Sequence, residues 1–330
     1  MSDLVSSAST SDVPATPRLR GTVALLVPAA IFLAFALAPL LVHAGLDPFY
    51  LSIVVRIMIF AIAAVSLDLI LGFGGLVSFG HAAFLGIGAY AVGILASHGA
   101  GDAFLQLPVA LFASAVFAFL TGWISLRTKG VHFIMITLAF AQMAYFMMTS
   151  LSAYGGDDGM TLWTRSTVAG SKVLGDTTAF YYACLGALIL SYAICRCLVV
   201  SRFGRVLRGA KENAVRMEAI GFDPFRFRLV AYVVSGMICG LAGFLLANHT
   251  EYVSPAYMAW QRSGELLIMV ILGGLGTLHG AIIGATAFLF LEEWLAGFTE
   301  HWRIVFGPLL VLVAIFMERG ILGAVTRRRR

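Results

Sequence analysis

The chain is poor in charge: only 12% of its 330 residues are Asp, Glu, Lys or Arg, whereas 60% are hydrophobic. A soluble protein of this length has too little interior to hide so much apolar side chain. The apolar residues come in repeated runs of about 20, the length at which a helix crosses the hydrocarbon core of a bilayer. These runs are continuous and do not alternate with polar residues, which excludes a β-barrel. The sequence therefore predicts an all-α polytopic membrane protein.

Cysteine is scarce as well. All four cysteines fall in or at the end of an apolar run: Cys184, Cys195, Cys197 and Cys239. None has a histidine partner at metal-binding spacing, and Cys195-x-Cys197 lacks the two-residue spacing of a redox pair. We interpret the cysteines as small hydrophobic residues and predict no metal site.

Two signals of other protein classes are absent. The chain has no G-x4-G-K-[ST] pattern, so we predict that it has no nucleotide site of its own, is not an enzyme and needs no cofactor. The Ser/Thr/Pro-rich residues 1–17 lack an apolar core, so they are not expected to be a cleavable signal. The first apolar run is then its own insertion signal.

The net charge of +5 does not indicate binding to nucleic acid. Most Lys and Arg residues lie in short segments between apolar runs, such as Arg127 and Lys129, or in the tail Arg327–Arg330. This clustering is the positive-inside signal of a bacterial inner-membrane protein, and it marks those segments as cytoplasmic.

About ten transmembrane helices are expected from the apolar runs. They cover roughly residues 22–42, 50–71, 81–97, 104–126, 131–149, 179–200, 229–247, 263–273, 281–295 and 305–317. An even number of spans places both termini on the same side, and the basic residues near them, Arg18, Arg20 and Arg327–Arg330, make that side the cytoplasm. Residues 1–20 are then a disordered cytoplasmic tail, 21–320 a single transmembrane domain, 151–178 a periplasmic loop and 321–330 a basic cytoplasmic tail.

Two glycine-rich segments interrupt the apolar runs, at Gly72–Gly80 and Gly273–Gly280, and we call them the glycine breaks. Glycine disfavours a continuous helix, so the spans beside them are expected to be broken or re-entrant. The two breaks resemble each other, with GGLVSFGHA at residues 74–82 and GGLGTLHGA at residues 273–281. Either they are related positions around a central pathway, or the likeness reflects the abundance of small residues in membrane helices.

One long polar segment, Ser201–Pro224, stands between apolar runs. Its periodicity predicts a single amphipathic helix over Gly204–Ile220, ended by Gly221 and Pro224. Its charge keeps it out of hydrocarbon, and its basic excess places it in the cytoplasm. The segment is either a docking element for a partner or a basic patch that rests in solvent or on anionic lipid. Its length and its defined end favour docking.

A family resemblance is carried first by residues 203–229, which read FGRVLRGAKEN-x4-EAIGFDPFRFRL. They resemble the cytoplasmic coupling segment of ABC importer permeases, most closely the branched-chain amino acid permeases of the LivM type. Further blocks resemble the same family in its own order, at residues 67–95, 129–143, 154–162 and 263–285. The resemblance covers roughly residues 50–320. One departure is Asp68, where the family more often has Asn.

The resemblance implies a membrane subunit that imports branched-chain or related amino acids. Such a subunit pairs with a second, related permease as a heterodimer, with two cytoplasmic ATPase subunits that bind the ATP, and with a periplasmic substrate-binding protein. By the family pattern, the ATPase-docking residues are Gly204, Arg205, Arg208, Glu212, Asn213, Glu218 and Gly221. Asp157 and Asp158 are either contacts for the binding protein or part of a solvated turn.

An amino acid zwitterion needs donors for its carboxylate and acceptors for its ammonium, and broken helix ends supply both without charged side chains. The candidate pathway residues lie in or beside the glycine breaks and in the fifth apolar run: Gly74, Gly75, Ser78, His81, Thr137, Gln142, Gly273, Gly274 and Thr277. Helix packing is the competing interpretation for the glycines. His81 and His279 are expected to be hydrogen-bonded interface residues rather than ligands.

The remaining charged residues near the spans are expected to be solvated or paired. Arg56 is expected to snorkel outward, and Arg262 to pair with Glu265 three residues later. A carboxylate within a span is costly, so Asp68 is expected either to be solvated at the interface or to interact with a neighbouring cation.

Three other functions were weighed against an amino acid importer. A urea or short-chain amide permease of the same superfamily would share these motifs. A polytopic membrane enzyme would need ionisable residues clustered at one depth, yet Arg56, Asp68 and His81 are scattered along the sequence. An ion-driven transporter would need an acidic relay, which is missing from the sequence.

Overall fold

A computed structural model describes residues 23–43, 49–297, 304 and 306–308 of the chain. The expected tails at 1–20 and 321–330 lie outside the described residues, as does most of the expected tenth span. The α-helices of the described part are α1 (Val23–His43), α2 (Phe49–Asp68), α3 (His81–Ser97), α4 (Ala103–Ser125), α5 (Val131–Ser150), α6 (Thr177–Val200), α7 (Arg202–Glu212), α8 (Ala214–Ala219), α9 (Pro224–Thr250), α10 (Trp260–Gly273) and α11 (Leu278–Ala296).

Among the described residues, six helices are long and apolar enough to cross a membrane: α2 with its π-helical continuation η1 (Leu69–Phe73), α4, α5, α6, α9 and α11. This confirms the prediction of a polytopic all-α membrane protein. The apolar helix α3 is shorter. With 14 residues, α10 is about 21 Å long at about 1.5 Å per residue, too short to cross a hydrocarbon core of about 30 Å alone.

Helices α2 and α9 form the centre of the bundle. In the most apolar 18-residue stretch of each helix, 83% of the residues are buried in α2 and 72% in α9, against 22% in α4. Helix α3 approaches α9 closely because glycines replace larger side chains at the contact. A Cβ on Gly88 would lie 2.1 Å from the carbonyl oxygen of Gly240, and one on Gly243 would lie 1.9 Å from that of Leu85. Glycine at these two positions therefore lets the backbones of α3 and α9 approach each other closely.

Both glycine breaks interrupt helices, as predicted. Helix α2 widens into the π-helical η1 and ends at Phe73, and no helix resumes until His81. Helix α10 ends at Gly273, and α11 begins at Leu278. Gly75, Gly274 and Gly276 have φ angles of 70°, 111° and 73°, a region that a residue with a side chain rarely adopts.

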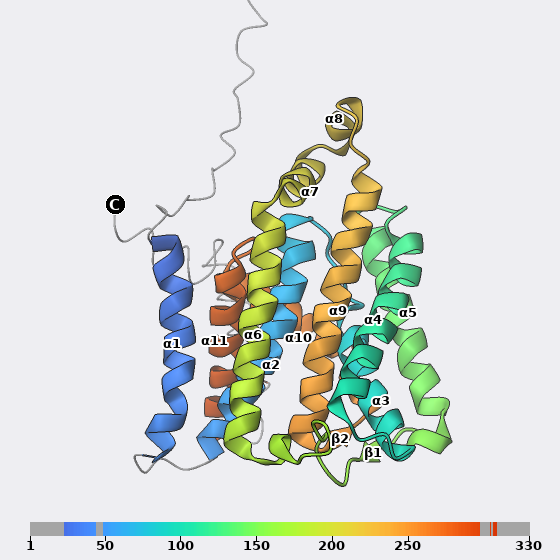
Figure 1. Ribbon diagram of the computed structural model, residues 1–330. Coiled ribbons are helices and arrows are strands. Elements are labelled where there is room, and N and C mark those ends of the chain that lie inside the picture. Colours follow the sequence, from blue (N-terminus) through green and yellow to red (C-terminus); the bar gives the residue numbers. More distant parts are fainter. Residues whose placement is uncertain (1–22, 44–48, 298–303, 305, 309–330) are drawn as a thin grey trace, which may run out of the picture.

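The polar segment forms two helices, α7 and α8, so the prediction of one continuous helix is wrong. Asn213 separates them with an extended backbone, and its side chain accepts a hydrogen bond from Arg216 N at 3.0 Å. Asparagine favours such a cap because its side chain competes with the helix for main-chain hydrogen bonds. The predicted end is confirmed, since Gly221 has a φ of 89° and Pro224 begins α9. In Figure 1, α7 and α8 stand beyond one end of the bundle.

The opposite end of the bundle carries the 151–176 loop, which contains short elements only (Figure 1). Strand β1 (Met160–Thr161) pairs antiparallel with β2 (Tyr252–Val253), which follows α9. The other short elements near this end are the 3-10 helices η2 (Ser152–Tyr154), η3 (Val173–Gly175) and η4 (Pro255–Met258). The loop is therefore tied to the end of the central helix α9.

Candidate functional site

The two glycine breaks meet near the end of the bundle that carries α7. A Cβ on Gly72 would lie 2.4 Å from Gly276 N and 2.2 Å from Asp68 Oδ1, so only glycine fits there. Gly276 N donates a hydrogen bond of 2.8 Å to Asp68 Oδ1. Two segments about 200 residues apart in the sequence are thus joined backbone to backbone and through one carboxyl group.

Asp68 is the last residue of α2 and is fully buried. Of the two expectations for Asp68, solvation at the interface is therefore wrong, whereas the charge of Lys211 acts on its carboxyl group, as the second expected of a neighbouring cation. Its Oδ1 is occupied by Gly276 N, while its Oδ2 has no hydrogen-bond partner among the described residues. A buried carboxyl group is costly unless its hydrogen bonds are satisfied. Its position between the two breaks therefore points to a role in how they are held.

Lys211 reaches this site from α7. Its Nζ donates a hydrogen bond of 2.8 Å to the carbonyl oxygen of Gly72, and its aliphatic stem covers Gly75. We define the glycine-break junction as Asp68, Gly72, Lys211 and Gly276. The family pattern did not point to Lys211. The helical spacing did point to Lys211, because it lies seven residues after Gly204 and three after Arg208. All three are therefore on the same face of the helix.

The other predicted pathway residues mainly hold the non-helical segment 74–80 in place. Thr137 Oγ1 of α5 accepts a hydrogen bond from Phe79 N at 3.3 Å, and Ser78 Oγ accepts one from Gly80 N at 3.3 Å. Gly74 lies against the carbonyl oxygen of Ile70. Hydrogen bonds thus hold segment 74–80 against α5 and also join residues within the segment.

His81 confirms its prediction as a hydrogen-bonded interface residue, because its Nε2 lies 2.8 Å from Ser66 Oγ. His279 differs, since its Nε2 is buried without a hydrogen-bond partner among the described residues. Gln142 Nε2 is likewise buried without one, again within the described part of the chain. These two polar groups are not part of the glycine-break junction as described.

At the second break, the predicted residues pack closely. A Cβ on Gly273 would lie 1.9 Å from the carbonyl oxygen of Gly280, which shows a packing role. Thr277 Oγ1 donates to the carbonyl oxygen of Gly274 at 2.6 Å, closing the turn before α11. The break is therefore a defined turn that presents Gly276 N to Asp68.

The predicted docking residues divide into two groups. Gly204 is buried against the end of α6, where a Cβ would lie 2.3 Å from the carbonyl oxygen of Val199. The Arg208 guanidinium turns back to donate to that same carbonyl at 2.5 Å and lies 5.7 Å from the ring centroid of Phe73. All members except Gly204 are exposed: Arg205, Arg208, Glu212, Asn213, Glu218 and Gly221.

Apolar side chains that the family pattern did not single out are also exposed around α8. Val215 in α8 is 71% exposed, and Ile220 directly after α8 is 62% exposed. Figure 1 shows α8 beyond the end of the bundle. Exposed apolar side chains on a projecting polar segment are typical of an interaction site. The α7–α8 projection thus presents both charged and apolar side chains.

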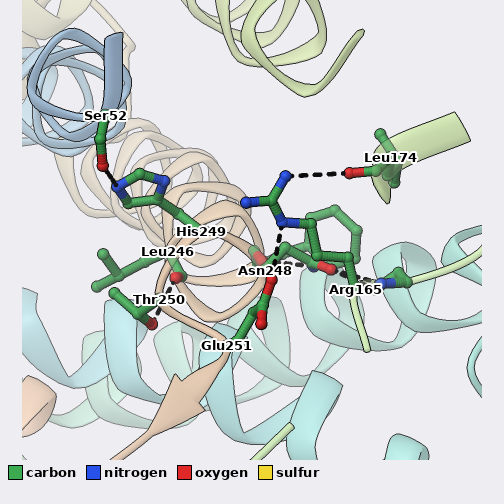
Figure 2. Close-up of polar contacts among 10 residues, drawn as sticks. Ser52, Arg165, Leu174, Leu246, Asn248, His249, Thr250 and Glu251 are labelled. Atoms are coloured by element: carbon green, nitrogen blue, oxygen red, sulfur yellow. Dashed lines mark hydrogen bonds and ion pairs between the residues drawn. The ribbon is translucent and has the colours of Figure 1, made fainter. Parts of the chain in front are cut away.

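At the other end, Arg165 ties the 151–176 loop to α9 (Figure 2). Its Nε lies 3.2 Å from Glu251 Oε1, and its Nη1 donates to the carbonyl oxygen of Leu174 at 3.4 Å. Its guanidinium carbon lies 5.0 Å from the ring centroid of Phe180. One side chain thus joins the loop, the end of α9 and the start of α6.

Buried amide groups support this attachment. Asn248 Oδ1 accepts hydrogen bonds of 2.7 Å from both the main-chain nitrogen and the hydroxyl of Ser166. The imidazole of His249 stacks on Phe180 and lies 3.4 Å from Ser52 Oγ (Figure 2). Sequence reasoning missed this set because its members are spread over five segments of the chain.

Asp157 and Asp158 are exposed on the same loop. The hydroxyl of Tyr252 donates to the main-chain oxygen of Asp158. The turn itself is shaped by Gly155, Gly156 and Gly159, all with positive φ. The structure thus presents the two predicted contact residues on a fixed turn.

Two further predictions concern charged pairs. Arg262 pairs with Glu265 at 2.7 Å, as predicted. Arg56 does not snorkel freely, because it pairs with Glu292 at 3.3 Å and with Glu293 at 3.8 Å on α11. The pairing follows from packing, because α2 and α11 lie side by side and the carboxylates of α11 are within reach of Arg56.

Comparison with known proteins yields one family. A family described as the permease component of branched-chain amino acid transport systems matches residues 49–314. The high-affinity branched-chain amino acid transport system permease protein LivM of Salmonella typhimurium is 29% identical over 315 residues, covering 87% of this chain and 74% of that protein. No solved structure gives a significant match.

Two further relatives are named for two different transport systems. The branched-chain amino acid permease protein LivH of Escherichia coli is 23% identical over 283 residues, covering 80% of this chain and 91% of that protein. The autoinducer 2 import system permease protein LsrC of an Enterobacter species is 26% identical over 303 residues, covering 87% of this chain and 85% of that protein.

Proposed function

We propose a transport function on one premise: this chain belongs to the family of branched-chain amino acid transport system permease components, which matches most of its length. The proposal is that it is the membrane-spanning permease subunit of an ABC importer for branched-chain or related amino acids. Separate ATPase subunits bind the ATP and drive it, so the chain needs no cofactor of its own. It lies in the bacterial inner membrane as a multi-pass protein.

The α7–α8 projection carries this proposal. Val215 and Ile220 are 71% and 62% exposed on a segment too polar to lie in hydrocarbon, so a protein surface is the partner that suits them. Arg205, Glu212 and Glu218 surround them with charge. We assign this surface to an ATPase subunit, and its basic excess places it in the cytoplasm.

The remaining partners follow from the same family. The curated relatives include both LivM and LivH permeases, which supports a second, related permease as the partner within the membrane. We assign Asp157 and Asp158, exposed on the loop at the opposite end, to contact with a periplasmic substrate-binding protein. This arrangement uses about ten spans with both termini in the cytoplasm.

The docking assignment is tested by charge substitution. Val215→Asp together with Ile220→Asp is expected to reduce co-purification of the ATPase subunits about tenfold or more, because a buried interface excludes unpaired carboxylates. Val173→Asp is the control, a valine 53% exposed at the other end of the bundle. Membrane insertion should be unchanged in both. Undiminished ATPase binding by the double variant would contradict the assignment.

The substrate class is tested by uptake. Membrane vesicles that contain the complete complex should take up labelled leucine in the presence of ATP. Urea and short-chain amides are the second candidate, because the named systems of the relatives extend beyond branched-chain amino acids to autoinducer 2. Uptake of urea without uptake of leucine would replace the amino acid assignment and leave the permease assignment intact.

A further inference from the structure

We propose that Lys211 and Asp68 are positioning residues that transmit movement of the docked α7 helix to both glycine breaks. Lys211 holds the first break from the cytoplasmic side, and Asp68 joins the first break to the second. The inference rests on the proposed transport function, and it concerns residues to which the docking and pathway assignments give no role.

The first step is the contact between α7 and η1. The Nζ of Lys211 donates to the carbonyl oxygen of Gly72 at 2.8 Å, and the Arg208 guanidinium lies over the ring of Phe73. Two side chains one turn apart on α7 therefore hold two consecutive residues of η1. A displacement of α7 by a docked partner would move the end of α2 with it.

The carbonyl of Gly72 is available because the helix ends there. The last carbonyl groups of a helix lack main-chain partners within it, and the chain beyond Phe73 is not helical. Lys211 supplies the missing donor from another element. The stem of Lys211 also lies on Gly75, where a Cβ would be 2.8 Å from its Cγ. The contact thus combines a hydrogen bond with close packing.

The second step is the contact between the breaks. Asp68 lies one turn before Gly72 on the same continuous helix, and its Oδ1 accepts from Gly276 N at 2.8 Å. The main chains of Gly72 and Gly276 are in contact at the same point. Movement of η1 is therefore passed to the turn before α11. Among the described residues, Lys211 and Asp68 do not form an ion pair with each other. In this link they are connected through Gly72, which both of them contact.

The test uses the complete complex in vesicles and measures ATPase binding, ATP hydrolysis and uptake of labelled leucine, or of the solute that the wild type imports. Lys211→Met keeps the stem on Gly75 and removes the donor, so uptake per ATP hydrolysed should fall about tenfold. ATPase binding should stay unchanged. Lys211→Arg restores a donor and should recover at least about half of the uptake. Lys129→Met, on an exposed cytoplasmic loop, is the control.

Asp68 is tested in the same way. Asp68→Asn keeps an acceptor for Gly276 N and should retain most of the uptake, whereas Asp68→Leu should lower uptake per ATP about tenfold. Combining Asp68→Leu with Lys211→Met should cost little more than either change, because both interrupt one link. The ratio of uptake to ATP hydrolysis separates a loss of coupling from a loss of stability, since misfolded protein loses both uptake and hydrolysis.

The outcomes distinguish the two proposals. Wild-type uptake by Lys211→Met, no recovery by Lys211→Arg, or a loss that follows loss of ATPase binding would each overturn the coupling link while the transport function stands. A hundredfold loss in the double variant, about the product of the single losses, would also overturn it. A wild-type complex that imports no solute with ATP would overturn the proposed function and this link together.

Discussion

Gly72 is the residue on which the most contacts of the glycine-break junction converge. Its carbonyl oxygen binds Lys211, and its α-carbon faces both Asp68 and Gly276. A methyl group has no room there, since the nearest atoms would be 2.2 and 2.4 Å away. The residue is glycine because of this close approach, whereas Gly75 in the same break is glycine because of its positive φ.

Gly72→Ala is therefore expected to destabilise the protein by about 1–3 kcal/mol, the usual cost of overpacking a tight interior. It should also lower uptake, because the two breaks are forced apart. Gly186→Ala on α6 is the control, since a Cβ there would meet nothing within 4 Å. The measurement is thermal unfolding in detergent together with uptake in vesicles. Equal unfolding temperatures for the two variants would contradict the close approach.

At the scale of elements, the two ends of the bundle are built differently. The α7–α8 projection is held at α7, through Gly204, Arg208 and Lys211, while α8 presents exposed side chains. The 151–176 loop is held along its length, by β1 and by Arg165. At one end, α8 thus projects from an anchored α7, and at the other end the 151–176 loop is anchored along its length.

Arg165→Met should loosen the loop without unfolding the bundle, because it removes the ion pair to Glu251 and the hydrogen bond to Leu174 while keeping an apolar stem near Phe180. Hydrogen exchange of main-chain amides in residues 160–175 should become about tenfold faster or more. Amides of α9 should be unchanged. Lys172→Met, on the same loop and exposed, is the control. Unchanged exchange in the Arg165 variant would show that β1 and Ser166 hold the loop alone.

At the scale of the whole molecule, the part of the chain that the structure describes forms one bundle of six long apolar helices with α1 and the shorter α3 and α10, and its opposite ends differ in character. Basic residues gather at the end that carries α7 and α8, which the positive-inside rule assigns to the cytoplasm. We propose on this basis that the loop with Asp157 and Asp158 is periplasmic.

This orientation is tested by cysteine labelling in whole cells, with Cys197 replaced by serine because it is the exposed native cysteine among the described residues. Asp158→Cys should react with an impermeant maleimide added outside. Ser11→Cys and Thr326→Cys, near the two ends of the sequence, should react only after the membrane is opened. Labelling of either terminal position in intact cells would contradict the placement of both termini in the cytoplasm.

The sequence by itself determined the features that depend on local composition and spacing. Runs of apolar residues determined the membrane class, glycine-rich segments determined where helices break, and Gly221 with Pro224 determined where the polar segment ends. These features are local because each rests on the conformational preferences and solvation of a few neighbouring residues. The split at Asn213 was also local, and it was missed because helical periodicity continues across the cap.

Only the tertiary structure decided which distant residues meet. Four kinds of contact join separate elements: Asp68 with Gly276, Lys211 and Arg208 with the carbonyl groups of η1 and α6, Arg56 with Glu292, and Arg165 with Glu251. Periodicity shows which face of a helix is apolar, but not which helix covers that face. Packing settles that choice for the whole bundle, because a buried polar group costs less where another element brings a partner to it.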